Sequence, residues 1–178
     1  MVWSCLVSIL PGMAQTEKLT DYVNPFVGTD GYGNVYPGAQ IPFGGIQISP
    51  DTDSRFYDAA SGYKYNHLTL MGFSLTHLSG TGIPDLGDFL FIPGTGEMKL
   101  EPGTHEDPDQ GYRSRYSHDK EWASPNYYAV ELADYGVKAE MTSGVRSGMF
   151  RFTYPESDNA FIMIDMNHTL WQSPDTNW

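Results

Sequence analysis

The second half of the chain alternates apolar and polar residues with a period of two, which is the pattern of half-buried β-strands. In residues 127–132 the side chains of Tyr128, Val130 and Leu132 fall on one face. The turn signal Ser143-Gly144 separates two of the alternating runs. The strands predicted in this half cover residues 127–132, 137–141, 150–154 and 161–166. Short strands at such regular spacing predict an antiparallel sandwich rather than βαβ units.

The first half is richer in turns, and its pattern is weaker. Glycine and proline break any periodicity between residues 21 and 43, and residues 50–61 and 93–122 are polar and loop-like. Strands are predicted at residues 43–49, within 62–73 and at 89–92. No segment predicts a helix. We therefore expect a mostly β fold, an antiparallel β-sandwich over residues 19–178.

The last predicted strand lies close to the end of the chain. A sandwich normally completes its second sheet, because an unpaired strand edge invites aggregation. We therefore expect the chain to be truncated and the sandwich to be incomplete at its C-terminus.

Residues 1–15, MVWSCLVSILPGMAQ, resemble a secretory signal segment, with Gly12 and Ala14 as small residues near a cleavage site. The positive n-region is missing, so a buried N-terminal strand is the alternative, and Cys5 leaves a lipoprotein as a weaker one. Cys5 is the only cysteine, which excludes an internal disulfide and favours a bacterial periplasm or bacterial secretion. No other segment reaches the ~18 apolar residues that a membrane span needs.

Composition limits the partners. The 178 residues are 40% hydrophobic and 14% aromatic, which is enough for a packed core, and 19 glycines and 12 prolines suit a turn-rich β protein. The net charge of −12 provides no basic surface for nucleic acid and disfavours anionic membranes. A neutral ligand such as a sugar is compatible with this charge.

One stretch, GFSLTHLSGTGIPDLGDF at residues 72–89, combines turn formers with polar groups between two apolar segments. Its glycines let backbone amides approach a ligand. Such a mixture suits the hydroxyl groups of a neutral carbohydrate. A surface loop whose polar groups satisfy its own backbone is an equally good interpretation. The polar side chains are Thr76, His77, Ser79, Thr81, Asp85 and Asp88.

Neither the carboxylates nor the histidine of this stretch form a catalytic motif. Asp85 and Asp88 could be the carboxylate pair of a glycosidase, but aspartates that cap turns are the favoured interpretation. His77 has no HxH or HExxH partner, so a hydrogen-bonded structural role is favoured over a metal ligand or a base. The remaining histidines are scattered and predict no site.

Three blocks of the chain closely resemble the N-terminal domain of glycoside hydrolase family 92. They are DYVNPFVGTDGYGNVYPGAQIPFGGIQISPDT, SGYKYNHLTLMGFSLTHLSGTGIPDLGDFLFIP and YRSRYSHDKEWASPNYYAVEL. The resemblance runs from about residue 19 to 166, in order and with similar spacing. The segments YPGAxxPFG, GFSxTHLSGTG and DxGD carry most of its specificity.

The resemblance implies a β-sandwich joined to a larger (α/α)6 helical barrel, with the active site between them. Family members are mostly exo-acting, calcium-dependent, inverting α-mannosidases. It implies that the general acid, the general base and most of the calcium site belong to the barrel. This chain is then expected to contain no catalytic residue, to be inactive alone, and to act on a mannose-containing glycan only together with the barrel.

The resemblance also implies which residues line the sugar pocket. The predicted substrate-binding residues are His77, Ser79, Gly80, Thr81, Gly82 and Asp85, and residues 30–36 are a weaker candidate block. The family often has a histidine where this chain has Leu75, and histidines in the glycine-rich loop where it has Asp30, Tyr32 and Asn34. These differences concern which glycosidic linkage the parent enzyme prefers. The alternatives are a stand-alone carbohydrate-binding sandwich without catalysis and a non-functional remnant.

Overall fold

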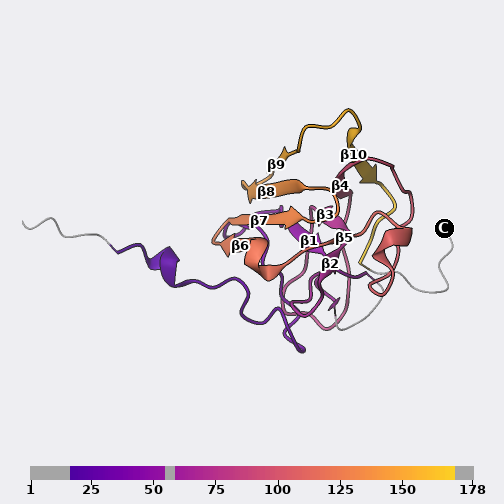
Figure 1. Ribbon diagram of the computed structural model, residues 1–178. Coiled ribbons are helices and arrows are strands. Elements are labelled where there is room, and N and C mark those ends of the chain that lie inside the picture. Colours follow the sequence, from indigo (N-terminus) through magenta and orange to yellow (C-terminus); the bar gives the residue numbers. More distant parts are fainter. Residues whose placement is uncertain (1–16, 55–58, 171–178) are drawn as a thin grey trace, which may run out of the picture.

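The computed structural model describes residues 17–54 and 59–170 (Figure 1). The predicted signal segment at residues 1–15, with Cys5, lies outside the described residues. Within these two ranges, no helix has the length and apolar character that crossing a membrane requires.

The described residues form antiparallel sheets joined by loops and short 3-10 turns, so the predicted fold class is confirmed. One sheet has the order β1-β3-β4-β10, a second has the order β6-β7-β8-β9, and β2 pairs with β5. The strands are β1 (Ser49–Asp51), β2 (Thr69–Leu70), β3 (Gly72–Ser74), β4 (Leu90–Thr95), β5 (Ser114–Arg115), β6 (Glu121–Ser124), β7 (Tyr127–Leu132), β8 (Val137–Ser143), β9 (Gly148–Thr153) and β10 (Ala160–Asp165). The 3-10 turns are η1 (Leu19–Tyr22), η3 (Pro108–Gln110) and η4 (His118–Lys120).

The sheet β6-β7-β8-β9 is a meander of consecutive strands, and its alternation confirms the sequence prediction. Val130 pairs with Ala139, which pairs with Phe152, so these three side chains share the face toward the core. Tyr128, Val130 and Leu132 are all buried. Because side chains alternate across a strand, the residues between them point outward.

The two larger sheets pack face to face through aromatic side chains. Phe73 on β3 pairs with Phe91 on β4. The ring centroid of Phe73 lies 6.2 Å from that of Phe152, and the centroid of Phe91 lies 4.9 Å from that of Phe150. The other face of β4 packs Leu90 and Ile92 against Met71, Tyr112 and Met163. Residues 90–92 of the apolar run FLFI are therefore covered on both faces, whereas Phe89 lies before β4 and is exposed.

Two predictions for the first half are wrong in part. Residues 43–49 form no continuous strand, because Phe43 has a φ of +59° and two glycines follow it; β1 begins only at Ser49. The segment 93–122 is more ordered than predicted, since it contains the end of β4, all of β5 and the start of β6. Arg113 and Tyr112 in this segment are buried.

Within the described residues, β9 and β10 are outer strands of the two sheets (Figure 1). Ile164 pairs with Phe91, so it shares the face of the first sheet that looks toward the second. Ile162 and Ile164 are nevertheless 51% and 47% exposed. The apolar face of β10 thus extends beyond the strands that cover the rest of this sheet.

A charged cross-strand cluster on the outer face of the meander should make stability depend on acid pH. Glu140 accepts hydrogen bonds from Arg151 Nε and Nη2 at 2.7 and 2.6 Å and from the Tyr127 hydroxyl at 2.7 Å. The bonds from Arg151, and then that from Tyr127, lower the pKa of Glu140 to about 2. An unfolded glutamate titrates at about pH 4.3, so this stabilisation is complete above that pH and is lost as the pH falls toward 2.

Glu140→Gln should therefore flatten the loss of stability between about pH 4.3 and 2. Urea unfolding of both proteins at a series of pH values measures this. An equally steep acid dependence in the variant would contradict the assignment.

Candidate functional site

The loop at residues 75–89 joins β3 to β4 at one end of the sandwich. Its base is closed by backbone hydrogen bonds from Gly87 N to Thr76 O and from Leu75 N to Asp88 O. Its tip meets the glycine-rich loop at residues 30–36, because Gly80 N donates to Asn34 O at 2.6 Å. The two loops that the sequence singled out are therefore neighbours in the structure.

Five of the six predicted substrate-binding residues lie on the open part of this loop. Ser79, Gly80, Gly82 and Asp85 are exposed, and Thr81 is half-buried. No heavy atom lies within 4 Å of the position where a Cβ would stand on Gly80 or Gly82. The tip thus presents hydroxyls, backbone amides and a carboxylate on an uncovered surface.

The structure separates His77 from the other five. His77 is 3% exposed, and both ring nitrogens bond to protein atoms. Nδ1 lies 2.7 Å from Gln47 O, and Nε2 lies 2.8 Å from Asp51 Oδ1. In this geometry His77 holds the start of the loop, as the hydrogen-bonded interpretation predicts, and its contact with a substrate stays a prediction.

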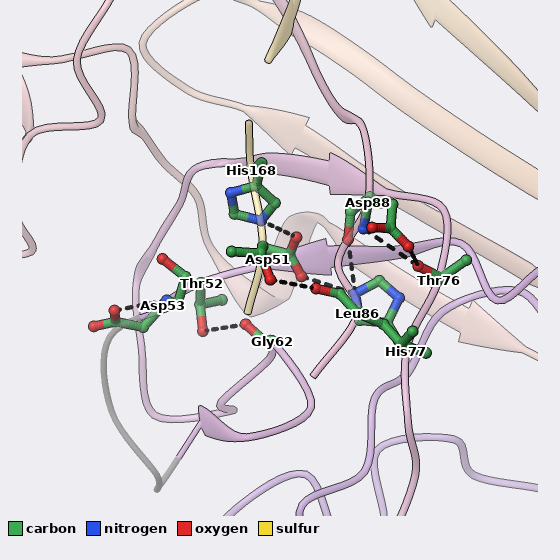
Figure 2. A network of polar contacts seen from close by, with 12 residues as sticks. Asp51, Thr52, Asp53, Gly62, Thr76, His77, Leu86, Asp88 and His168 are labelled. Atoms are coloured by element: carbon green, nitrogen blue, oxygen red, sulfur yellow. Dashed lines mark hydrogen bonds and ion pairs between the residues drawn. The ribbon is translucent and has the colours of Figure 1, made fainter. Parts of the chain in front are cut away.

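Asp51, the last residue of β1, lies at the centre of this buried network (Figure 2). His168, which follows β10, places Nε2 at 2.9 Å from the other carboxylate oxygen, Oδ2. Burial alone would raise the pKa of the Asp51 carboxyl, but the charge of His77 and the hydrogen bonds from both histidines hold it well below its ordinary value. Asp51 is therefore an ionised carboxylate in the interior.

The aspartates at the loop's end bond to its own groups. Asp85 Oδ1 accepts from Leu86 N at 2.8 Å. Asp88 Oδ2 accepts from the Thr76 hydroxyl at 2.8 Å, and Thr76 Oγ1 accepts from Asp88 N (Figure 2). These contacts are those of turn-capping residues, the interpretation that the sequence favoured over a catalytic pair.

Unusual backbone angles gather in the loops at this end. Asn34, Phe43, Leu86 and Phe89 have φ values of +48°, +59°, +68° and +57°. Non-glycine residues rarely adopt these angles, and such positions are concentrated at functional sites. Phe43 is also fully exposed, and its loop contacts the turn after β8 through a hydrogen bond from Gly45 N to Val145 O.

A charged cavity lies elsewhere in the domain. A cavity of about 350 Å³ at the opposite end of β4 is lined by charged groups that include Lys99, Asp109 and Asp134. Arg115 bridges the two aspartates at 2.9 Å each. None of the predicted substrate-binding residues lines this cavity. This charged cavity and the loop at residues 75–89 are therefore separate features of the domain.

Comparison with known proteins identifies the domain. Residues 22–178 match the sequence model of the glycosyl hydrolase family 92 N-terminal domain. The chain belongs to this family. The match covers both loops of the candidate site and every strand of the sandwich.

Relatives of this family 92 domain are much longer proteins. An uncharacterized secreted glycosidase of Arthroderma benhamiae is 30% identical over 139 residues, which are 77% of this chain and 17% of that protein. The family 92 glycosyl hydrolase ccman5 superposes with a TM-score of 0.72 at 30% identity, covering 85% of this chain and 21% of that one. The family 92 inverting mannosidase of Bacteroides thetaiotaomicron gives 0.67 at 29% identity, covering 84% and 20%. The chain therefore spans about a fifth of the length of these relatives.

Among the residues of this family 92 domain that the structure describes, no cluster of side chains fits a calcium site by itself. Within residues 17–54 and 59–170, no three or more histidine, cysteine, aspartate or glutamate side chains gather in a way that could hold a metal ion. Calcium prefers six to eight oxygen ligands. No step is therefore assigned to calcium in this domain.

Sequence reasoning missed the residues that support the loop. Asp51 stands in a stretch predicted to be a polar loop, yet residues 51–54 are all buried. The histidines that predicted no site each bond within the chain: His67 to Thr52, His105 to Asp53 and Thr69, His118 to Glu121, and His168 to Asp51. The available signal was a carboxylate two residues after the strand predicted at residues 43–49, but its partner His168 lies 117 residues away.

Proposed function

We propose that this family 92 domain lines the sugar pocket of an exported, calcium-dependent, inverting exo-α-mannosidase that acts on mannose-containing glycans. One observation supports this proposal most directly. The chain belongs to this family, and its loop at residues 75–89 is anchored at the base and has an exposed polar tip at residues 79–85. The inverting mannosidase of Bacteroides thetaiotaomicron and the secreted glycosidase of Arthroderma benhamiae support the activity and the export.

The open geometry of the loop supports a two-domain pocket. Exposed apolar side chains occur on the tip and on two other loops: Ile83 on the tip is 62% exposed, and Phe43 and Val145 are 102% and 60% exposed on loops joined by the bond from Gly45 N to Val145 O. Large uncovered apolar surfaces are typical of interaction sites. A second, helical domain that covers these side chains would supply the other wall of the pocket. The same surface argues against a stand-alone carbohydrate-binding sandwich.

The proposed role of this domain is to bind and orient the sugar. The hydroxyls of Ser79 and Thr81, the amides of Gly80 and Gly82 and the carboxylate of Asp85 are suited to sugar hydroxyl groups. An inverting glycosidase keeps its two catalytic carboxyls about 6.5–9.5 Å apart, so that water fits between the base and the sugar. In this proposal both carboxyls, and most of the calcium ligands, come from the second domain, and the loop excludes other water from the sugar.

Hydrolysis of α-linked mannobiose by the full-length gene product tests the proposal. We expect mannose to appear first as the β-anomer in ¹H NMR spectra, and the activity to disappear with EDTA and return with calcium. This domain alone should be inactive. Absence of hydrolysis by the gene product, together with calorimetric binding of mannose by this domain alone, would support the carbohydrate-binding alternative instead.

Ser79→Ala tests the contribution of the loop itself. Loss of one hydrogen bond to the sugar should lower kcat/KM about tenfold, without a change in the unfolding temperature. Ser124→Ala is the matched control, because Ser124 is also exposed but lies on β6 in the other sheet. Equal kcat/KM values for the two variants would show that Ser79 does not contribute to sugar binding.

A further inference from the structure

We propose that Asp51 is a positioning residue of the candidate sugar site, and that its buried carboxylate fixes both ends of the loop at residues 75–89 through His77 and His168. The nature of the ligand rests on the proposed function. The anchoring itself rests only on the contacts of Asp51.

The first contact is an ion pair at the start of the loop. His77 Nδ1 faces the backbone carbonyl of Gln47 at 2.7 Å, and Nε2 faces Asp51 Oδ1 at 2.8 Å. A carbonyl and an ionised carboxylate only accept hydrogen bonds, so both nitrogens of His77 must carry protons. The Ser74 hydroxyl, 3.1 Å from Nε2, can accept a share of the same proton. His77 is therefore an imidazolium whose side chain is fully buried against Asp51.

The second contact reaches the far end of the loop through the segment behind β10. Asp51 Oδ2 accepts from His168 Nε2 at 2.9 Å (Figure 2). Two residues further on, Leu170 N donates to Leu86 O at 2.8 Å, and the Thr169 hydroxyl donates to the same oxygen at 3.2 Å. One carboxylate thus joins β1, the start of the loop and, through residues 168–170, the end of the loop.

Close packing around these contacts leaves the base of the loop little conformational freedom. A Cβ on Gly87 would lie 2.7 Å from Leu170 Cγ, and a Cβ on Gly62 would lie 2.1 Å from Asp51 Oδ1. The tip between the two anchors is different, since positions 80 and 82 have open space around them. A fixed base with an open tip is the arrangement that holds polar groups ready for a ligand, because less freedom is lost on binding.

The protonation of His77 in the wild-type chain is the first test. ¹H–¹⁵N spectra of the imidazole groups at neutral pH should show two protonated nitrogens for His77. A neutral His77 with one protonated nitrogen would overturn the ionic anchor.

Asp51→Asn is the second test, and hydrogen exchange is its readout. We expect the amides of residues 77–87 to exchange at least about tenfold faster in the variant, while those of β7 and β8 keep their rates. Asp53→Asn is the matched control: Asp53 is also buried and bonds to a histidine, His105, at 3.1 Å. Unchanged loop rates in Asp51→Asn, or a uniform rise over the whole chain, would overturn the positioning role.

Variants of His168 decide the question if Asp51→Asn does not fold. His168→Gln keeps an N–H donor for Asp51 Oδ2, whereas His168→Ala removes it. We expect the alanine variant to speed exchange at Leu86 and Gly87 about tenfold and the glutamine variant to restore much of the protection. Equal rates in the two variants would contradict the second anchor.

Kinetics separate this inference from the proposed function. In the mannobiose assay, Asp51→Asn should raise KM about tenfold and change kcat less, because the loop binds rather than reacts. A loosened loop with unchanged KM would overturn the role of Asp51 in sugar binding. If the wild-type gene product hydrolyses nothing, the proposed function fails, and the spectra and exchange rates alone decide the anchoring.

Discussion

Phe73→Ala should destabilise the domain by about 3–5 kcal/mol, the usual loss when a large buried aromatic side chain is removed. Phe73 is fully buried, and its ring lies between the first sheet and Phe152 of the second. The sheets cannot close on the cavity, because Phe91 pairs with Phe73 on the same face and is itself packed on Phe150. Urea unfolding should show a lower midpoint with an unchanged slope.

Phe43→Ala is the control for this change, since Phe43 is the same residue type and fully exposed. We expect its free energy of unfolding to differ from wild type by no more than about 0.5 kcal/mol. A comparable loss in both variants would mean that Phe73 does not lie in the core that joins the sheets.

Glu121→Leu should cost about 2–4 kcal/mol, because it leaves buried hydroxyl donors without their acceptor. Glu121 Oε1 accepts from the Tyr63 and Tyr128 hydroxyls at 3.0 and 2.5 Å, and Oε2 lies 2.6 Å from His118 Nδ1. Burial, and then the charge of Glu121, raises the pKa of Tyr128 well above its ordinary value, so its hydroxyl stays a donor at neutral pH.

The same substitution at Glu131 is the matched control. Glu131 lies on the neighbouring strand β7 and forms an exposed ion pair with Lys120 at 3.1 Å. Exposed pairs contribute about 0–1 kcal/mol, so Glu131→Leu should change the free energy of unfolding little. Thermal unfolding of the two variants measures the difference. Equal losses of stability would show that the buried Glu121 network stabilises the domain no more than the exposed ion pair does.

The meander could be predicted from the sequence because each of its strands follows a local rule. Alternation placed Tyr128 and Val130 inside and Lys138 outside without any knowledge of their partners. The first sheet follows no such rule. Its strand β1 is three residues long and ends in a polar residue, Asp51, whose burial depends on histidines 26 and 117 positions away. Residue order alone does not specify such distant pairs.

The candidate site likewise has a part that the sequence predicts and a part that it does not. Glycines, hydroxyls and aspartates between two apolar segments were sufficient to locate the loop and its exposed tip. The pattern favoured a hydrogen-bonded structural role for His77, but it did not reveal that Asp51, 26 positions away, is the partner. The contact of Gly80 with Asn34, which joins the two loops, is a backbone hydrogen bond and leaves no mark on side-chain chemistry.

The strand orders of the two large sheets have a consequence for how the chain folds. In the sheet β6-β7-β8-β9 every strand pairs with its neighbour in sequence, whereas β10 must find β4, from which it is separated by the whole meander. Short loops close at a smaller entropic cost than long ones, so contacts between adjacent segments form faster. The meander is therefore expected to assemble first and to provide the surface on which β4 and β10 meet. The segment at residues 168–170 follows β10, so its link to Asp51 would be among the last contacts to form, and the loop at residues 75–89 would reach its final shape only when folding is nearly complete.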